Sequence, residues 1–204
     1  MNELPSSART GGRDAVVVLV SGRGSNLRAL AGAMDEGRCR GRIAGVVADR
    51  RRCDALHWAE GRGWPTRSVR PRDHEDREAW DRALANTVTE LKPDLVVLAG
   101  FMRIVGPAML EAWGGRIVNV HPSLLPAFPG MYAPEQAVAA GTARSGCSVH
   151  LVDGGVDTGP VLAQAACDVL RDDTPQTLHR RIQALEHDLL PRVVDSLLAA
   201  RSAG

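Results

Sequence analysis

Residues 15–27 read AVVVLVSGRGSNL, an uninterrupted apolar run followed by a turn with two glycines. The apolar run is rich in valine and has no polar residue at alternate positions, so it predicts a strand buried on both faces. A helical pattern continues from Leu27 through Leu30, Ala33 and Met34. A buried strand that leads directly into a helix is typical of an open parallel α/β sheet.

The same alternation of strands and helices continues to about residue 120. Apolar runs predict strands, and the segments between them predict helices. We expect strands at 41–49, 66–70, 94–99 and 116–120, and helices at 54–61, 75–91 and 107–113. Pro107 lies at the first turn of the last of these helices, where proline is favoured.

The regular alternation of predicted strands and helices ends at about residue 120. HPSLLPAFPG at 121–130 predicts a proline-rich loop. Two strands are expected at 147–152 and 161–169, joined by a loop with the sequence DGGVDTGP, and a long helix at 174–200. The predicted fold is therefore α/β: an open, doubly wound, mostly parallel sheet with an antiparallel C-terminal strand portion and a long C-terminal helix.

Length and charge are those of an ordinary globular protein. The 204 residues suit one domain, and we interpret 14–201 as that domain and 1–13 as a disordered tail. Lys and Arg number 25 against 24 Asp and Glu, which gives a formal net charge of +1. This balance argues against nucleic acid or a membrane surface as partner.

Because neither a secretory signal nor an apolar span of about 18 residues is visible, we expect a cytoplasmic protein.

The four cysteines do not indicate a metal site. They form no CxxC pair and match no zinc spacing, so we expect free thiols that act as small hydrophobic residues. The loop DGGVDTGP also lacks the full calcium-loop pattern. We therefore expect no metal.

The turn at 21–26 is typical of a phosphate-binding loop. Its glycines let backbone N–H groups approach an anion, and the helix N-terminus adds unpaired donors. The side chains of Arg23, Ser25 and Asn26 could add further donors. Because the third glycine of the dinucleotide fingerprint and the lysine of a Walker A motif are both missing, a single phosphate is favoured. The alternative interpretation is a plain strand-to-helix turn with Ser25 or Asn26 as the N-cap.

Asn119, His121 and Asp157 are the candidate catalytic residues. Asn119 and His121 lie two apart at the end of a predicted strand, so their side chains point to one face. A carboxamide and an imidazole there can both donate to a developing oxyanion. Asp157 could orient the imidazole and take a proton from an attacking amine. A histidine before Pro122 and an aspartate in a glycine-rich loop are also common as purely structural residues.

The reaction class suggested is acyl transfer without a covalent enzyme intermediate, since no GxSxG elbow or Cys–His dyad is present. With these motifs, the chain resembles the folate-dependent phosphoribosylglycinamide formyltransferase family. The resemblance covers about residues 15–195. Its segments are VVVLVSGRGSNL at 16–27, LKPDLVVLAGFMRIV at 91–105, RIVNVHPSLLPAFPG at 116–130, SVHLVDGGVDTGPVLAQ at 148–164 and Glu186-His187.

The resemblance implies a Rossmann-like formyltransferase fold and a reaction in purine synthesis. The formyl group of the co-substrate 10-formyltetrahydrofolate would pass to the amine of glycinamide ribonucleotide. Both are small-molecule partners, and we expect a monomer or homodimer. The nucleotide-phosphate half would span about 14–115, and the folate and catalytic half about 116–201.

The resemblance also implies a role for each matched position. Asn119, His121 and Asp157 match the family's catalytic residues, with Asn119 and His121 on the oxyanion and Asp157 in the proton relay. The positions implied to hold the ribonucleotide are Gly22, Arg23, Gly24, Ser25, Asn26 and Glu186. Those implied to hold the folate are Arg77, Met102, Arg103, Ile104, Val105, Asn119, Val152, Asp153, Gly154, Gly155 and Val156. Arg103 would meet the glutamate carboxylate of the folate.

Two positions depart from the family pattern. Arg23 stands where relatives usually carry Asn or Thr, and Tyr132 stands where they usually carry His. The segment Ala133–Gln136 is similar to the corresponding loop of methionyl-tRNA and nucleotide-sugar formyltransferases. The alternatives are therefore a formyltransferase for another small amine, such as a nucleotide sugar, a formyltetrahydrofolate hydrolase, and a non-enzymatic folate- or nucleotide-binding protein.

Overall fold

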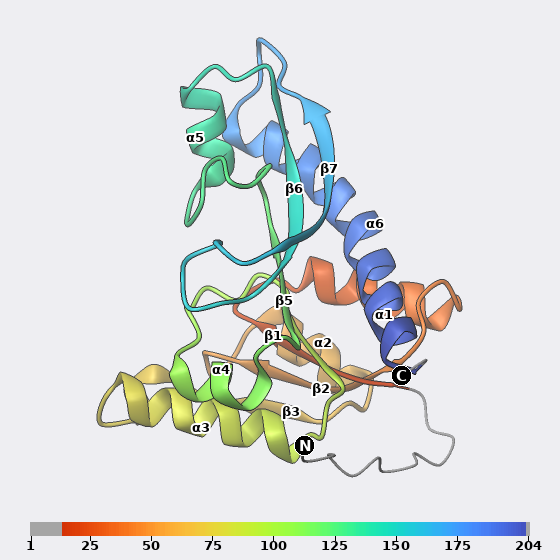
Figure 1. Cartoon of the computed structure of the whole chain (residues 1–204), viewed down its shortest axis with the longest axis vertical. Coiled ribbons are helices and arrows are strands. Elements are labelled where there is room, and N and C mark those ends of the chain that lie inside the picture. The colour runs from red at the N-terminus through yellow and green to blue at the C-terminus, as the bar shows by residue number, and fades with distance from the viewer. Residues whose placement is uncertain (1–13, 203–204) are drawn as a thin grey trace, which may run out of the picture.

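A computed structural model describes residues 14–202, so the tail predicted for residues 1–13 lies outside the described part. A seven-stranded sheet with the order β3-β2-β1-β4-β5-β6-β7 forms its centre (Figure 1). The strands are β1 (Ala15–Val20), β2 (Arg42–Ala48), β3 (Thr66–Ser68), β4 (Leu95–Leu98), β5 (Ile117–His121), β6 (Arg144–Leu151) and β7 (Val161–Asp168). The α-helices are α1 (Ser25–Asp35), α2 (Asp54–Gly61), α3 (Arg77–Glu90), α4 (Pro107–Trp113), α5 (Ala133–Ala139) and α6 (Pro175–Ser202).

The predicted fold class is confirmed. Strands β1 to β5 pair in parallel, whereas β6 pairs antiparallel with both β5 and β7. Two details differ from the prediction. Helix α5 was expected to be part of a loop, and β6 begins at Arg144 instead of Cys147 because its first residues pair with the end of β7.

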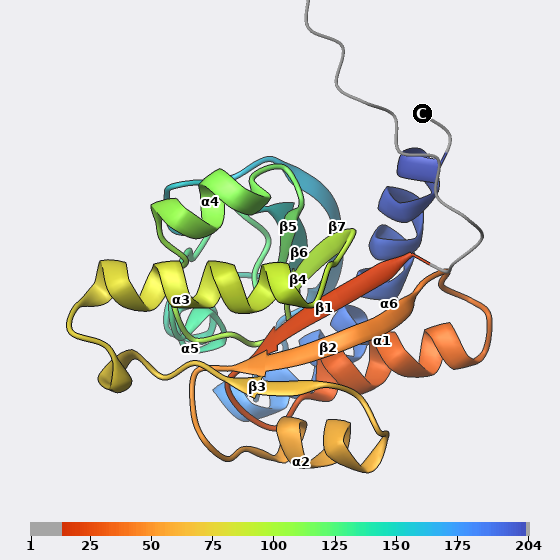
Figure 2. The ribbon, with the colours of Figure 1, turned by 90° about the horizontal axis from the view of Figure 1, so that it is seen from below.

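Helices cover both faces of the parallel part of the sheet (Figure 2). Every side chain of β1 is buried, and the pleat sends successive side chains to opposite faces. Val16, Val18 and Val20 pack in a core with residues of α1, α2 and α6. Val17 and Leu19 pack in a second core with residues of α3 and α4. The continuous apolar run of β1 is thus explained by its place between two helical layers.

The chain changes direction within the sheet at β1. It proceeds from β1 through β2 to β3, then returns to β4 on the other side of β1. Open α/β sheets bind ligands beyond the carboxyl ends of the strands at such a switch point. Here the two loops that follow β1 and β4 contact each other, because Ser21 N donates to Gly100 O at 3.1 Å and Met102 N donates to Ser21 Oγ at 2.8 Å.

Candidate active site

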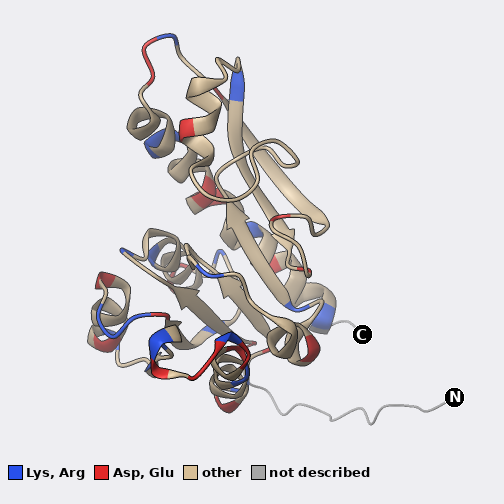
Figure 3. Ribbon diagram, turned by 90° about the vertical axis from the view of Figure 1, so that its left-hand side faces the viewer, with Lys and Arg blue, Asp and Glu red and all other residues tan. Residues whose placement is uncertain are grey.

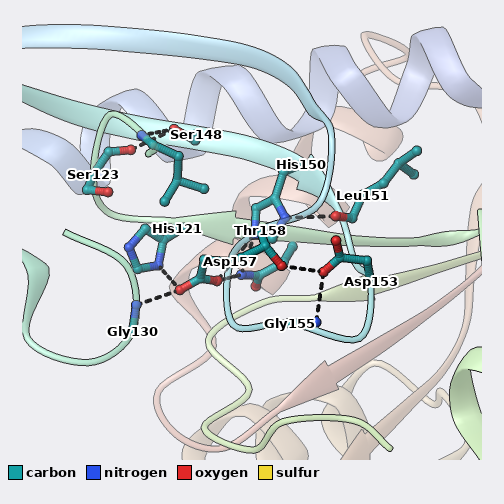
Figure 4. A network of polar contacts seen from close by, with 12 residues as sticks. His121, Ser123, Gly130, Ser148, His150, Leu151, Asp153, Gly155, Asp157 and Thr158 are labelled. Atoms are coloured by element: carbon teal, nitrogen blue, oxygen red, sulfur yellow. Dashed lines mark hydrogen bonds and ion pairs between the residues drawn. The ribbon is translucent and has the colours of Figure 1, made fainter. Parts of the chain in front are cut away.

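Asp157 is the centre of a polar network at the end of β5 (Figure 4). Its carboxylate accepts a hydrogen bond from Asn119 Nδ2 at 3.2 Å and one from the backbone N–H of Gly130 at 2.7 Å. The same carboxylate lies 3.2 Å from His121 Nδ1. The structure therefore brings together the three residues that the sequence analysis singled out.

The environment of Asp157 favours its ionised form. Partial burial raises the pKa of this carboxyl group. The contact with His150, the N–H of Gly130 and the charge of His121 outweigh that effect, so the pKa of Asp157 lies below its ordinary value. The backbone of Asp157 is left-handed, with a φ of 54°.

His121 is buried, and both of its ring nitrogens face oxygen atoms. Nε2 lies 2.9 Å from the carbonyl oxygen of Phe128, and Nδ1 faces Asp157 Oδ2. A carbonyl and a carboxylate only accept hydrogen bonds, so the doubly protonated ring is the form that satisfies both contacts.

His150 is a member of the network that the sequence analysis did not single out. It lies directly opposite Asn119 in the antiparallel pair of β5 and β6. Its Nε2 is 3.1 Å from Asn119 Nδ2 and 3.4 Å from Asp157 Oδ1, and its side chain is almost fully buried. Only the register between two strands, which the local sequence does not specify, could have identified it.

Ser148 fixes the proline-rich loop that follows β5. This fully buried side chain on β6 donates to the carbonyl of Ser123 at 2.7 Å and accepts from the N–H of Leu125 at 3.0 Å. Gln164 on β7 donates to the Ser148 hydroxyl and to the carbonyl of Leu125, both at 2.8 Å. The predicted loop is therefore anchored to the sheet immediately after His121.

The turn after β1 leads into α1 with Gly24 as the N-cap, in a left-handed conformation with a φ of 75°. A Cβ at this position would lie 2.6 Å from the Cβ of Ala55. The alternative with Ser25 or Asn26 as the N-cap is wrong, because both residues lie inside the helix. Ser25 Oγ accepts from Gln183 at 2.9 Å, and Asn26 Nδ2 donates to Glu186 at 2.9 Å.

All six positions expected to hold the ribonucleotide line one cleft of about 350 Å³. Helix α6 forms its opposite wall with His179, Gln183 and Glu186, of which only Glu186 was expected there. Val120 and Pro122, on either side of His121, also line the cleft. The cleft therefore extends from the first turn of α1 to the end of β5.

Glu186 has an unusual electrostatic environment. Its side chain is 4% exposed, and burial raises its pKa to about 7, although the hydrogen bond from Asn26 opposes this shift. The amide oxygen of Asn26 is buried and has no hydrogen-bond partner among residues 14–202. A ligand with a hydroxyl or amine at this point would supply the missing donor.

Arg23 and His179 lie close enough to affect each other. Burial lowers the pKa of His179, and the charge of Arg23 lowers it further. The lowered pKa keeps the His179 imidazole neutral, so Arg23, and not His179, supplies positive charge near the turn at 21–26 and favours an anion there.

Most of the positions expected to hold the folate lie in one region, formed by the segments 102–105 and 152–156. Met102 is 59% exposed, Ile104 49% and Val156 44%, so three apolar side chains of this region face solvent. Val105 is buried and packs in the second core. Val152 packs against the same core.

The polar residues of this region contact the chain itself. Arg77 Nη2 donates to the carbonyl of Ile104 at 2.8 Å. Arg103 Nε donates to the buried carboxylate of Asp49 at 2.8 Å, while 46% of its side chain stays exposed. Asp153 accepts from Gly155 N and from Thr158 Oγ1, which closes the turn that contains Gly154.

The described residues give no sign of a metal centre or a membrane segment. No group of three or more His, Cys, Asp or Glu side chains within residues 14–202 is placed to hold a metal ion. No helix in the same part of the chain is long and apolar enough to cross a membrane. The four cysteines are free, as expected.

Comparisons with known proteins agree on one family. A family model described as formyl transferase matches residues 14–194. The phosphoribosylglycinamide formyltransferase of Mycobacterium tuberculosis strain H37Rv is 47% identical over 182 residues, which are 89% of this chain and 84% of that protein. The Bacillus subtilis enzyme of the same name is 38% identical over 92% of this chain and 96% of its own length. The crystal structure of glycinamide ribonucleotide transformylase 1 from Symbiobacterium toebii is 44% identical and superimposes with a TM-score of 0.90, covering 92% of this chain and 89% of that one.

Proposed function

This chain belongs to the formyl transferase family, and we propose that it transfers the formyl group of 10-formyltetrahydrofolate to the amine of glycinamide ribonucleotide. One observation carries the proposal. The cleft at the start of α1 is lined by the two neighbours of His121, so a ligand bound there reaches the network of Asn119, His121 and Asp157. Such an arrangement suits a phosphorylated substrate whose far end reacts at the network.

The ribonucleotide phosphate would bind at the turn before α1. Backbone N–H groups of the first helical turn have no intrahelical partner, and they attract anions together with the helix dipole. The guanidinium of Arg23 would add a charge-assisted hydrogen bond. Glu186 and the unpaired amide oxygen of Asn26 would accept hydrogen bonds from hydroxyl groups of the ribose.

The folate would lie on the other side of the network, and the residues there fit such a group. Met102, Ile104 and Val156 expose apolar surface that a flat aromatic ring would cover. The backbone of 152–156 would offer polar groups to the ring edge, and Arg103 would meet the glutamate carboxylate of the folate, with Arg77 on the same side. The bound co-substrate supplies the formyl group that the amine attacks.

Asn119, His121 and Asp157 would each have a separate role in the reaction. Asn119 and the cationic ring of His121 donate to the formyl oxygen as it becomes negatively charged, which is the largest source of rate enhancement in such sites. Asp157 holds His121 in its charged form and accepts the proton that the amine loses. The new bond joins the amine nitrogen to the formyl carbon, the bond from that carbon to N10 breaks, and the proton ends on N10.

A single assay tests this proposal. Purified protein is mixed with 10-formyltetrahydrofolate, and tetrahydrofolate formation is followed by absorbance with and without glycinamide ribonucleotide. We expect turnover only when the ribonucleotide is present. Formation of tetrahydrofolate without it would indicate a hydrolase, and folate binding without turnover in either arm would indicate a binding protein.

Asn119→Ala tests the role of the network in the same assay. Removal of one oxyanion donor typically lowers kcat by about 10²–10³, and we expect a loss of that order. Asn86→Ala, an exposed position on α3, is the matched control and should keep full activity. Turnover of Asn119→Ala near that of the wild type would contradict the proposed role.

A further inference from the structure

Three polar side chains of α6 form a row along the ribonucleotide cleft, which is the cleft of about 350 Å³ expected to hold the ribonucleotide. They are His179, Gln183 and Glu186, and spacings of four and three residues place them on one face of the helix. Gln183 donates to Ser25 Oγ, and Glu186 accepts from Asn26 Nδ2. Residue numbers thus increase in the same direction along both walls. His179, one helical turn before Gln183, therefore lies opposite the residues that precede Ser25.

The charge of Arg23 supports this placement of His179. Burial lowers the pKa of the imidazole, and the positive charge of Arg23 acts on the ring and lowers its pKa further. Arg23 is exposed and His179 is half-buried, and neither makes a hydrogen bond or ion pair within residues 14–202. A guanidinium and an imidazole therefore lie near each other at the start of the turn, and both are available to a ligand.

Charged groups near His179 come from several elements. Arg23 lies on the turn after β1, Arg50 on the loop after β2, and Glu135 in the first turn of α5. Glu135 raises the pKa of His179, but burial and Arg23 outweigh it, so the imidazole is neutral in the free chain at neutral pH. Glu186, on α6 itself, has a pKa of about 7 and is partly protonated under the same conditions.

Positive charge dominates the ribonucleotide cleft. Figure 3 shows several Lys and Arg segments on the loops of the lower part of the molecule, which contains β1 to β4. Arg23 and Arg50 both line the cleft, whereas Glu186 is the only acidic residue among the described residues that line it. Because Glu186 is partly protonated at neutral pH, the cleft has a positive field that attracts an anion.

A phosphate group in this position would change the protonation of His179. A phosphate monoester carries nearly two negative charges at neutral pH, because its second pKa is about 6. An opposite charge within about 4–6 Å favours the charged form of a histidine. The charged imidazole donates from both ring nitrogens, and hydrogen bonds that involve an ionised group are roughly twice as strong as those between neutral groups.

We propose that His179 is a specificity-determining residue for the phosphate of the ribonucleotide, and that it takes up a proton from solvent when this phosphate binds. The inference rests on the proposed function and adds a proton to the binding step. This proton stays on the imidazole until the nucleotide leaves, so it is separate from the proton that the amine loses to Asp157. Because the complex binds more protons than the free chain, affinity for the ribonucleotide increases as the pH falls through the pKa of His179 in the complex.

Isothermal titration of the full chain with glycinamide ribonucleotide counts this proton directly. Each titration is made at about pH 7.5, where the phosphate is already almost fully ionised, in two buffers with different ionisation enthalpies. The difference in heat gives the number of protons taken up. We expect the wild type to take up at least about half a proton more than His179→Gln. Glu186 can exchange a proton too, but it does so in both proteins and cancels in the difference.

His179→Gln should also bind the ribonucleotide about five- to tenfold more weakly, because it loses a charge-assisted hydrogen bond. His179→Lys separates this charge from the proton uptake. A lysine is protonated in both the free and the bound chain near this pH. The variant should therefore recover most of the affinity and take up no more protons than His179→Gln.

His57→Gln is the matched control. His57 is exposed on α2 and does not line the ribonucleotide cleft. This variant should match the wild type in both affinity and proton uptake. Ribose 5-phosphate is a second ligand, which keeps the phosphate and lacks the glycinamide group. It should show the same difference in proton uptake between the wild type and His179→Gln.

Three results would overturn the inference. They are equal proton uptake by the wild type and His179→Gln, equal affinity of these two proteins for the ribonucleotide, and a loss of proton uptake in His57→Gln as large as that in His179→Gln. Ribonucleotide-dependent turnover combined with any of them would contradict only this inference. The expected proton uptake with ribose 5-phosphate, combined with no formyl transfer to glycinamide ribonucleotide, would contradict the proposed function and leave His179 as a phosphate-binding residue.

Discussion

Asp157 shows how much a single residue can determine at this site. Its carboxylate contacts Asn119, His121, His150 and the N–H of Gly130. The left-handed backbone of this residue has a φ of 54° and is uncommon outside glycine. The network around it therefore compensates an unfavourable local conformation, which is frequent where a side chain has to be aimed at a reaction centre.

Gly24→Ala should disrupt the turn before α1. The φ of 75° disfavours any residue with a Cβ, and the new methyl group would lie 2.6 Å from the Cβ of Ala55. We expect a loss of about 2–4 kcal/mol in the free energy of unfolding and a higher KM for glycinamide ribonucleotide. Urea denaturation and steady-state kinetics measure the two effects.

Gly32→Ala is the control for that substitution. Gly32 lies inside α1, and a Cβ there meets no atom within 4 Å. Alanine is the better helix former by about 0.5–1 kcal/mol, so this variant should be as stable as the wild type or slightly more so. Equal stability of Gly24→Ala and Gly32→Ala would show that the turn tolerates a side chain.

Glu186→Gln should change how stability depends on pH. The pKa of Glu186 rises from 4.5 to about 7 in the folded chain. Between these values the unfolded state ionises while the folded state stays protonated, so wild-type stability falls as the pH rises and the loss is complete above pH 7. Glutamine never ionises. The variant should gain on the order of 3 kcal/mol relative to the wild type between pH 4.5 and pH 8.

Urea denaturation of both proteins at several pH values measures that difference directly. Glu186→Gln can keep the hydrogen bond from Asn26 Nδ2, so the surrounding structure stays the same. The other groups then titrate alike in both proteins, and their contributions to stability cancel in the difference. If the two stability curves ran parallel from pH 4.5 to pH 8, Glu186 would have an ordinary pKa in the folded chain.

Residues of the site differ in how well the sequence predicts them. Asn119, His121 and Asp157 were found because each is next to a local signal, namely the end of an apolar strand or a glycine-rich loop. His150 and Gln183 carry no such signal. His150 joins the network through its register opposite Asn119, and Gln183 reaches Ser25 from a helix 158 residues further along the chain.

At the scale of elements, Asp81 connects two helices. This buried side chain on α3 accepts hydrogen bonds from the N–H groups of Gly106 and Ala108, both at 2.7 Å, and of Met109 at 3.3 Å. It thus caps the N-terminus of α4, the helix that follows the folate segment 102–105. The cap comes from a different helix, 25 residues earlier in the chain.

Asp81→Ala should lower stability much more than an ordinary surface substitution. Three backbone donors, two of them buried and one half-buried, would lose their acceptor, which costs about 2–4 kcal/mol. For a chain of this size the melting temperature should fall by about 5–15 °C. Glu78→Ala, on the exposed side of the same helix, should change it by less than about 2 °C. Equal effects of the two variants would contradict the capping role.

Most elements are predictable from local patterns, and the exceptions have physical reasons. The strands β1 and β4 are continuous apolar runs, and their positions are confirmed within a residue or two. Helix α5 was missed because its seven residues lie between a proline-rich loop and a turn, and its packing against α6 determines it. Helix α6 continues through Pro191, whose missing N–H would end many helices, because its apolar face is buried along the sheet.

At the scale of the whole molecule, the cleft expected to hold the ribonucleotide brings together the turn after β1 and helix α6, which lie far apart in the sequence. The turn at 21–26 forms one wall, and α6 forms the other. The division into a nucleotide half at 14–115 and a folate half at 116–201 remains a prediction, and residues from both ranges line this cleft. Among residues 14–202, the hydrogen bonds of Ser25 with Gln183 and of Asn26 with Glu186 join side chains of the two walls.

Glycinamide ribonucleotide should therefore stabilise both walls together. At one hundred times its dissociation constant, a ligand of the folded state adds about 2.7 kcal/mol to the free energy of unfolding, which raises the melting temperature by about 5–10 °C. Hydrogen exchange should slow in the first turn of α1 and in residues 179–186 of α6. Glycinamide without the ribose phosphate is the control and should have no effect. Protection of α1 alone would contradict a ligand that bridges the walls.

The hydrogen bond between Asn26 and Glu186 links residues 160 positions apart in the sequence, and this has a consequence for protein synthesis. Domains begin to fold from the N-terminus while the ribosome is still translating. The strand β1 and its turn leave the ribosome before α6 does, and the cleft between them and α6 cannot exist until α6 has been released as well. A product of premature termination before residue 179 would contain Asn119, His121 and Asp157 but no second wall. The late synthesis of α6 thus delays the formation of this cleft until Gln183 and Glu186 have been translated.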